Sequence, residues 1–406
     1  MNLTLFLNHQ CNLRCRYCYV GRKFDRAMPL PLAKRAVDFG LDRVRSLPAL
    51  PAAERRGRAR EPSQGSHPDR ARDGQLHLAF FGGEPLLELE LMRAIANYAV
   101  AEAEKRELSV GFSLSTNGTL LDEPRLQFLR DFAVDVQVSA DGCSRAQDLA
   151  RPFTDGMGSF TAVDGNLRRL AQEGLVHQLV AVMTPATVPW LVESLRYLAS
   201  LEVPEIYFAP DFSGDWSEDA CAGFETAFRA LTDAYAELFR GGILRRVDPL
   251  YGKIVTHLIS GRQAPRRCGF GEEELAVSPQ GRIYPCDRMV RQDDDPTYVL
   301  GDVTTGLDEA RAHTLQERRR ATDPECATCE LGQRCATWCG CAQFETTGGL
   351  GRVSPLFCWL ERLFITEADR LASALFAERN PTFLRDLYRL EPVKEPPRGK
   401  LLRTSV

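Results

Sequence analysis

Residues 2–18 read Asn-Leu-Thr-Leu-Phe-Leu-Asn-His-Gln-Cys-Asn-Leu-Arg-Cys-Arg-Tyr-Cys, an apolar run followed at once by three closely spaced cysteines. The apolar run predicts a buried strand, and apolar spacings of three and four in residues 30–46 predict a helix. The thiols of Cys11, Cys15 and Cys18 lie in one short loop and can converge on one point. The chain is therefore expected to begin with a strand, a cysteine loop and a helix.

The alternation of strand and helix patterns continues along the chain to residue 240. Strands are expected at 76–81, 109–115, 134–139, 178–183 and 205–209, and helices at 86–106, 123–132, 162–173, 187–200 and 217–240. Six strand–helix units in a row predict a parallel α/β sheet, either doubly wound or curled into a partial barrel. Functional groups are then expected at the carboxyl ends of the strands.

Composition restricts the class of protein further. The 406 residues are 44% hydrophobic and 26% charged, which is enough for one large core or two smaller ones. The formal charge of -4 lacks the basic excess of a general nucleic-acid binder, and no apolar run approaches the roughly 18 residues of a membrane span. With no export signal, the odd count of 13 cysteines favours metal ligands over disulfides, so we expect a cytoplasmic protein with neither nucleic acid nor membrane as partner.

Two parts of the chain depart from the alternation. Residues 48–74 are rich in Pro, Arg, Ser and Gly and predict a mobile insertion. After residue 262 the sequence changes to short extended segments, turn residues and cysteines, with a hairpin expected at 275–285. Helices are expected at 355–375 and 382–390, before a frayed tail.

The spacing Cys11-x3-Cys15-x2-Cys18, with Tyr17 directly before the third cysteine, resembles the signature of the radical S-adenosylmethionine (radical SAM) superfamily. The other motifs of that superfamily have counterparts at the ends of the next three expected strands. These counterparts are Gly82-Gly83-Glu84-Pro85, Ser115-Thr116-Asn117-Gly118, Ser139-Ala140-Asp141-Gly142 and the following Asp148-x2-Arg151 stretch. The resemblance covers residues 1–225 and implies a partial (β/α)6 barrel of the TIM type.

The resemblance implies that three thiolates hold a [4Fe–4S] cluster and leave one iron open to chelate S-adenosylmethionine. Glu84 is expected to accept the ammonium group of this cofactor, and the two glycines before it to let backbone approach its methionine part. The complete set of expected cofactor contacts is Gly82, Gly83, Glu84, Ser115, Asn117, Ser139 and Arg151. For the cysteine loop taken alone, a Cys3His zinc site that includes His9 is the alternative.

Eight further cysteines lie in the last third of the chain, in a spacing that resembles the SPASM domain of radical SAM peptide and protein modifiers. The resemblance implies two auxiliary [4Fe–4S] clusters. It assigns Cys326, Cys329, Cys335 and Cys358 to the distal cluster, and Cys268, Cys286 and Cys339 to the cluster nearer the barrel. Either Cys341 completes the second set or one iron stays open, and a zinc ribbon remains the alternative for pairs such as Cys326 and Cys329.

These expectations divide the chain into a core barrel (1–225), a helical linker (226–262), a SPASM domain (263–365) and terminal helices with a tail (366–406). Asp287 follows Cys286 in a Tyr-Pro-Cys-Asp context, where the related anaerobic sulfatase maturases use an aspartate as a base. We therefore take Asp287 as the candidate catalytic residue, with a second-shell or surface role as the alternative.

The resemblance implies an oxidoreductase that cleaves S-adenosylmethionine to a 5′-deoxyadenosyl radical and oxidises a peptide, forming a thioether or carbon–carbon crosslink. Formylglycine formation in a sulfatase is the first alternative, and a non-catalytic iron–sulfur protein for electron transfer or redox sensing is the second. Expected partners are a peptide or protein substrate, a flavodoxin- or ferredoxin-type electron donor and a separate leader-peptide recognition protein, because Cys11 arrives too early for a recognition domain to precede it.

Overall fold

The computed structural model describes residues 1–46, 75–259, 269–321 and 323–388. The predicted insertion at 48–74, the tail from Pro392 and Cys268 lie outside these described residues.

One sheet of eleven described strands runs through the molecule in the order β11-β10-β9-β8-β1-β2-β3-β4-β5-β6-β7. Strands β1 to β7 follow one another as parallel neighbours, and β8 also pairs in parallel with β1. The last four strands form antiparallel pairs. Their bounds are β1 Asn2–Phe6, β2 Gln75–Phe81, β3 Ser109–Thr116, β4 Asp135–Ser139, β5 Val176–Met183, β6 Glu205–Pro210, β7 Arg246–Asp248, β8 Glu274–Val277, β9 Arg282–Tyr284, β10 Gly301–Asp302 and β11 Gly306–Leu307.

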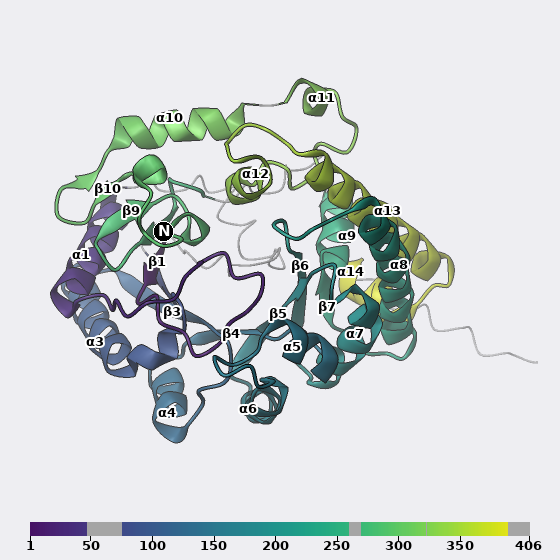
Figure 1. Cartoon of the computed structure of the whole chain (residues 1–406), viewed down its shortest axis with the longest axis horizontal. Coiled ribbons are helices and arrows are strands. Elements are labelled where there is room, and N and C mark those ends of the chain that lie inside the picture. The colour runs from purple at the N-terminus through teal and green to yellow at the C-terminus, as the bar shows by residue number, and fades with distance from the viewer. Residues whose placement is uncertain (47–74, 260–268, 322, 389–406) are drawn as a thin grey trace, which may run out of the picture.

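Helices surround the parallel strands on the outside of an arc, as expected for a partial barrel (Figure 1). They are α1 Leu30–Ser46, α3 Leu89–Lys105, α4 Glu123–Asp131, α5 Ser144–Ala150, α6 Phe160–Gln172, α7 Leu191–Ser200 and α8 Glu218–Arg240, with 3-10 turns η1 Pro85–Glu88 and η2 Val188–Trp190 before α3 and α7. The remaining helices are α9 Leu250–Ile259, α10 Glu309–Arg320, α11 Pro324–Ala327, α12 Gly340–Thr347, α13 Pro355–Ala377 and α14 Pro381–Leu387. Strands β9 and β10 and helices α10 and α12 occupy the open side of the arc (Figure 1).

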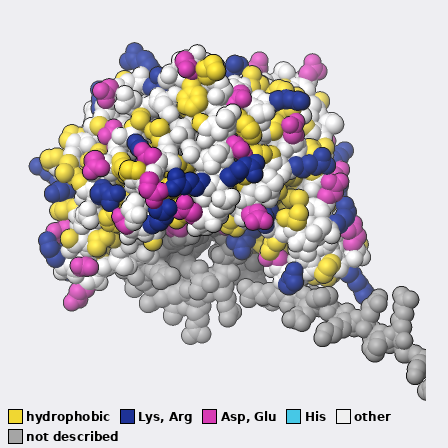
Figure 2. Space-filling model, turned by 90° about the horizontal axis from the view of Figure 1, so that it is seen from below, with side chains coloured by type: hydrophobic (Ala, Val, Ile, Leu, Met, Phe, Trp, Pro, Cys, Tyr) yellow, Lys and Arg dark blue, Asp and Glu magenta, His cyan; other side chains and the backbone are white. Residues whose placement is uncertain are grey.

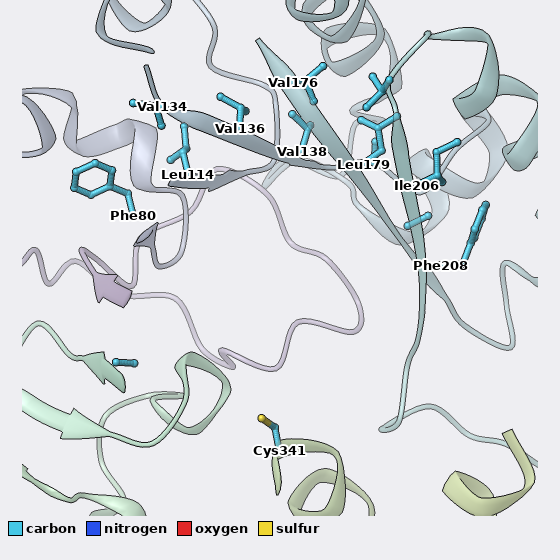
Figure 3. Close-up of a cluster of buried hydrophobic side chains, with 14 of the residues drawn as sticks. Phe80, Leu114, Val134, Val136, Val138, Val176, Leu179, Ile206, Phe208 and Cys341 are labelled. Carbon is cyan, nitrogen blue, oxygen red and sulfur yellow. The ribbon is translucent and has the colours of Figure 1, made fainter. Parts of the chain in front are cut away.

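Apolar side chains of the strands form a continuous core with the helices that cover them. Phe80, Val136, Val138 and Phe208 are among its fully buried members, at 0 to 1% exposure, and Figure 3 shows them along β2, β4 and β6. Helix α1 packs closely against β1 and β2 because Gly40 has no side chain. A Cβ at Gly40 would lie 3.0 Å from the side chain of Leu3. This packing fixes the first helix against the strand that leads into the cysteine loop.

The segment predicted as a helical linker contains more than helix. Helix α8 runs without interruption across the expected boundary at residue 225, and β7 adds a parallel strand beside β6. The three residues of β7 are too few to give a periodic signal, which is why the sequence did not predict this strand.

Among the described residues, no helix is both long enough and apolar enough to cross a membrane. Figure 2 shows acidic and basic side chains interspersed over the face seen from below.

Candidate iron–sulfur and cofactor site

The cysteine loop leaves the carboxyl end of β1 and is held against the segment that follows α5. Backbone N–H groups of Arg14 and Arg16 donate to the carbonyls of Pro152 and Ala150, at 2.8 and 2.9 Å. This pairing joins the cysteine loop to the end of α5, so the position of the loop depends on residues more than 130 positions away in the sequence.

Each sulfur of the loop has a nitrogen donor from the protein. The thiol of Cys11 accepts from the backbone N–H of Leu13 at 3.4 Å and from Asn117 Nδ2 at 3.7 Å. A guanidinium nitrogen of Arg151 lies 3.7 Å from Cys15 Sγ, and Lys23 Nζ lies 2.8 Å from Cys18 Sγ. Donors of this kind stabilise the negative charge of cluster-bound thiolates.

Burial disfavours the thiolate form of these cysteines when they are considered alone. It raises the pKa of Cys11 and raises the pKa of Cys15 to about 11, although Arg151 lowers the latter in part. A thiolate at either position therefore needs a bound cation, because positive charge compensates the loss of solvent. The half-buried thiols and their N–H donors fit an iron–sulfur cluster.

Two glycines bring the end of β2 against the chain that enters the cysteine loop. The Gly83 N–H donates to the carbonyl of Asn8, and the Glu84 N–H to that of Gln10, both at 2.8 Å. A Cβ at Gly83 would lie 2.1 Å from the Gln10 carbonyl oxygen, and Gly82 has a φ of +145°. In this structure, the close approach that these glycines permit is to the backbone of residues 8–10.

Glu84 is completely buried, and both of its carboxylate oxygens have donors within the protein. Oε1 accepts from Thr116 Oγ1 at 2.7 Å and from the N–H of Leu86 at 3.1 Å, while Oε2 accepts from the N–H of Asn117 at 2.8 Å. Burial raises the pKa of Glu84. The side chain thus ties the end of β2 to the end of β3, and carries Asn117 towards Cys11.

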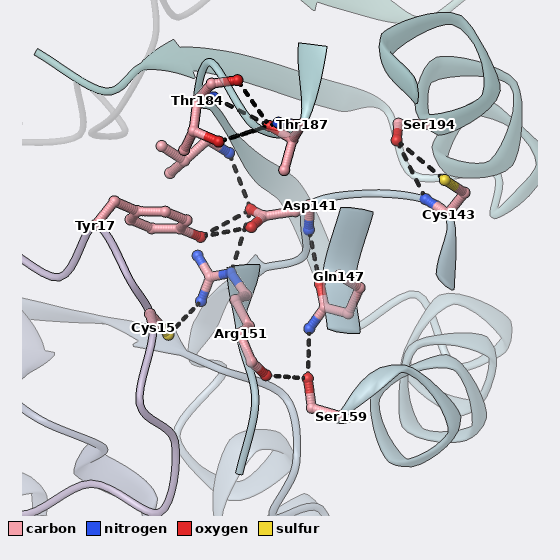
Figure 4. Close-up of polar contacts among 11 residues, drawn as sticks. Cys15, Tyr17, Asp141, Cys143, Gln147, Arg151, Ser159, Thr184, Thr187 and Ser194 are labelled. Carbon is pink, nitrogen blue, oxygen red and sulfur yellow. Dashed lines mark hydrogen bonds and ion pairs between the residues drawn. The ribbon is translucent and has the colours of Figure 1, made fainter. Parts of the chain in front are cut away.

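Asp141 organises the polar contacts between the cysteine loop and the ends of β4 and β5 (Figure 4). Tyr17 donates to both of its oxygens, at 2.9 and 2.7 Å, and the N–H of Val182 donates to Oδ1 at 2.9 Å. Arg151 Nε lies 3.2 Å from the same carboxylate, and the guanidinium lies over the Tyr17 ring, 5.2 Å from its centroid. Asp141 therefore holds the cation that contacts Cys15.

The two remaining predicted cofactor contacts lie on strand ends without touching the cysteine sulfurs. Ser115 Oγ donates to Gln137 Oε1 at 2.7 Å, from β3 to β4. Ser139 is the last residue of β4 and is half-buried. Both lie at the carboxyl half of the parallel sheet.

A cavity of about 240 Å³ opens beside the cysteine loop. Tyr17, Ala150, Thr184, Thr187 and Asp211 are among its lining residues, from the loop itself, from the end of α5 and from the segments after β5 and β6. The sequence did not predict that Thr184, Thr187 and Asp211 belong to the site, or that Tyr17 pairs with Asp141. The three lining residues follow strands β5 and β6, where ligand-binding residues gather in parallel α/β folds, and this position could have indicated them.

His9 is occupied by a contact outside the cysteine loop. Its Nε2 lies 3.0 Å from the carbonyl oxygen of Arg291, and its ring stacks on Phe24 with centroids 4.4 Å apart. Burial lowers the pKa of His9 to about 4, so the ring is neutral near pH 7. In the described chain, no group of three or more His, Cys, Asp or Glu side chains is arranged to hold a single metal ion.

Three of the cysteines considered for the nearer auxiliary cluster, Cys286, Cys339 and Cys341, lie in the described residues and meet beside the open side of the barrel. Cys341 Sγ lies 3.1 Å from Cys286 Sγ, and the Cys341 thiol also shares a hydrogen bond with Cys339. That hydrogen bond lowers the pKa of Cys339 to about 7. Asp287, the candidate base, is buried, accepts from the Cys286 thiol at 3.1 Å and accepts from the Tyr19 hydroxyl at 3.2 Å.

Of the cysteines expected for the distal cluster, Cys326 lies in α11, Cys329 and Cys335 follow that helix, and Cys358 lies in the first turn of α13. Burial, Asp323 and the neighbouring thiols of Cys358 and Cys329 raise the pKa of Cys326. Burial and the carboxylate of Glu361 raise the pKa of Cys335 to about 12. None of the described cysteines forms a disulfide.

Comparison with known families identifies the two parts of this arrangement. Residues 6–198 match the family model of the Radical SAM superfamily, and residues 268–330 match that of SPASM, an iron–sulfur cluster-binding domain. The chain therefore contains a radical SAM domain and a SPASM domain, as its cysteine spacing and strand-end motifs predict. These domains imply iron–sulfur clusters and binding of S-adenosylmethionine.

Among individual proteins, the chain is 26% identical to PqqA peptide cyclase of Gluconobacter oxydans, over 88% of this chain and 90% of that protein. It is 23% identical to the cysteine-type anaerobic sulfatase-maturating enzyme of Clostridium novyi, over 81% of this chain and 84% of that enzyme. The match to the uncharacterized protein MJ0907 of Methanocaldococcus jannaschii is 26% identical and spans 51% of this chain but only 61% of that protein.

A solved structure, native anSMEcpe with bound AdoMet and Cp18Cys peptide, has the same fold. It superimposes with a TM-score of 0.72 and 19% identity, covering 93% of this chain and 99% of that one. The prediction of a partial barrel followed by a cysteine-rich SPASM domain is thus confirmed.

Proposed function

We propose that this chain is a radical SAM enzyme that cleaves S-adenosylmethionine reductively and oxidatively modifies a peptide, forming a thioether or carbon–carbon crosslink in a ribosomally made substrate. The observation that carries the proposal is the loop of Cys11, Cys15 and Cys18, in which every sulfur has an N–H donor. The similarity to a peptide cyclase along 88% of the chain supports the peptide as substrate.

In this proposal, those three cysteines hold the cluster, which supplies an electron for cleavage of S-adenosylmethionine to a 5′-deoxyadenosyl radical. Lys23 and Arg151 provide positive charge beside the ligand sulfurs of Cys18 and Cys15. Tyr17 and Asp141 hold Arg151 in place, and the cavity that Tyr17 lines gives reactants access to the loop.

The remaining predicted groups have positioning and proton-accepting roles. Glu84 orders the end of β3, so that Asn117 reaches Cys11. Asp287 accepts a proton during substrate oxidation, with the Tyr19 hydroxyl orienting its carboxylate. The cysteines of the SPASM region would hold two auxiliary [4Fe–4S] clusters, which would supply a route for the second electron to an electron-transfer partner.

Formylglycine formation is the second candidate, favoured by the similarity to sulfatase-maturating enzymes over more than four fifths of the chain. One experiment separates the two: the anaerobically reconstituted protein is incubated with S-adenosylmethionine, dithionite and either a cysteine-containing sulfatase peptide or precursor peptides encoded beside the gene. The proposal predicts that a precursor peptide loses two hydrogens and gains a crosslink in tandem mass spectra. An aldehyde on the sulfatase peptide, with no crosslinked precursor, would support the alternative instead.

A further inference from the structure

Three described thiols come together between the β8–β9 hairpin and α12. Cys286 lies directly after β9, Cys339 caps the start of α12, and Cys341 lies in the first turn of that helix. The Cys341 sulfur is 3.1 Å from that of Cys286 and shares a hydrogen bond with Cys339, so it lies in contact with both. Cys341 is 6% exposed, and Figure 3 shows its side chain apart from the strand residues of the core.

The surroundings of this thiol group suit metal-bound thiolates. The guanidinium of the half-buried Arg288 is a positive charge acting on both Cys339 and Cys341, and it lies over the ring of Tyr19 at 4.9 Å. Arg288 also pairs with Glu345 at 3.3 Å, which holds it in position. A cation next to several sulfurs offsets the negative charge that metal ligation leaves on them.

No other described cysteine is placed to join Cys286 and Cys339. Residues 269–275 form a turn and the start of β8 and contain no cysteine. Cys143 contacts Ser194 Oγ at 3.7 Å, and the Cys221 thiol donates to the carbonyl of Trp216 at 3.8 Å. Cys341 alone among the spare thiols reaches the pair.

We infer that Cys341 is an iron ligand of the auxiliary cluster that Cys286 and Cys339 hold. The inference rests on the proposed presence of that cluster and is independent of which reaction the enzyme performs. The Cys341 thiolate comes from the first turn of α12. As a consequence, a substrate does not have to supply a thiol at the iron that Cys341 binds.

The test uses the full chain with Cys11, Cys15 and Cys18 replaced by Ala, which removes the cluster of the cysteine loop and leaves only auxiliary signals. Cys341→Ala and Cys341→Ser are added separately to this chain, and Cys143→Ala serves as the matched buried-thiol control. After anaerobic reconstitution, we measure iron per chain and the electron paramagnetic resonance spectrum of the reduced protein, with and without 2-mercaptoethanol.

Both Cys341 variants are expected to lose or shift the signal of one auxiliary cluster while the other signal persists, and 2-mercaptoethanol is expected to restore the signal in Cys341→Ala. The control variant keeps both signals. Spectra and iron content of the Cys341→Ser variant that match the control would overturn the inference, and serine preserves the size of the side chain should alanine impair folding. Because no substrate is used, failure of the proposed reaction would leave this result unaffected.

Discussion

At the scale of single residues, Asp141 links the cysteine loop to the ends of β4 and β5. It accepts from Tyr17 and Val182 and lies 3.2 Å from the buried Arg151, which in turn contacts Cys15. The carboxylate therefore compensates a buried cation and fixes its orientation. Residues that act through another in this way position the site and do not react themselves.

We predict that Asp141→Asn destabilises the protein by about 3 kcal/mol, because removing one member of a buried ion pair leaves the other charge without compensation. Urea unfolding of the cluster-free protein under reductant measures the change. Asp131→Asn is the matched control, since its pair with Arg93 is exposed, and it is expected to cost less than about 1 kcal/mol. Equal losses in the two variants would show that the Asp141 network contributes no specific stability.

At the scale of elements, the contact between the end of β2 and the cysteine loop depends on the absence of a side chain at Gly83. We predict that Gly83→Ala binds substantially less iron after reconstitution than the wild type, because its Cβ would lie 2.1 Å from the Gln10 carbonyl and displace the loop. Iron per folded chain is the measurement. Gly165→Ala, in α6 with nothing within 4 Å of the added Cβ, is the control and should bind iron normally.

The distal cysteine loop is held by two helices that pack against each other, α9 and α13. Lys253 Nζ donates to Glu361 Oε2 at 2.6 Å and to the carbonyl of Arg334 at 2.9 Å, and Glu361 also accepts from the N–H of Ala336. These contacts hold the backbone on both sides of Cys335. The buried pair therefore connects the end of the sheet domain to the cluster-binding segment.

We predict that Lys253→Met costs about 3 to 5 kcal/mol of stability, since it leaves Glu361 buried without its cation. Faster loss of iron to a chelator from the reconstituted protein is expected as well, because the Cys335 loop loses an anchor. Thermal unfolding and the rate of chelation measure the two effects. Arg240→Met, from the exposed pair with Glu378, is the control, and a Lys253→Met protein as stable as this control would contradict the prediction.

At the scale of the whole molecule, much of the fold follows from local patterns. Helix α1 has the predicted bounds, because its apolar residues recur at helical spacing. The sequence did not predict α10, whose Glu-Ala-Arg-Ala-His-Thr-Leu-Gln-Glu-Arg-Arg-Arg has too few apolar residues for a periodic signal. It also treated β7 as part of a helical linker, since three residues carry no period.

The site shows the same division between local and distant information. The motif resemblance singled out Glu84, Asn117 and Arg151; Glu84 and Asn117 follow β2 and β3, and Arg151 lies at the end of α5. The sequence did not reveal that Thr116 and Asn117 donate hydrogen bonds to the carboxylate of Glu84. It also did not reveal that Tyr17 donates to the carboxylate of Asp141, 124 residues away. Such contacts depend on the register of the sheet and the path of the loops, which local patterns do not specify.

The central claim is that the cysteine loop and the strand ends form a radical SAM site, and its most direct test needs no peptide. The protein is reconstituted with iron and sulfide without oxygen, reduced with dithionite and given S-adenosylmethionine, and 5′-deoxyadenosine is quantified together with iron, for which about 12 atoms per chain correspond to three clusters. We predict reductant-dependent 5′-deoxyadenosine that disappears in Cys15→Ala. A fully loaded wild-type protein that forms none would contradict the claim and favour an electron-transfer or redox-sensing role.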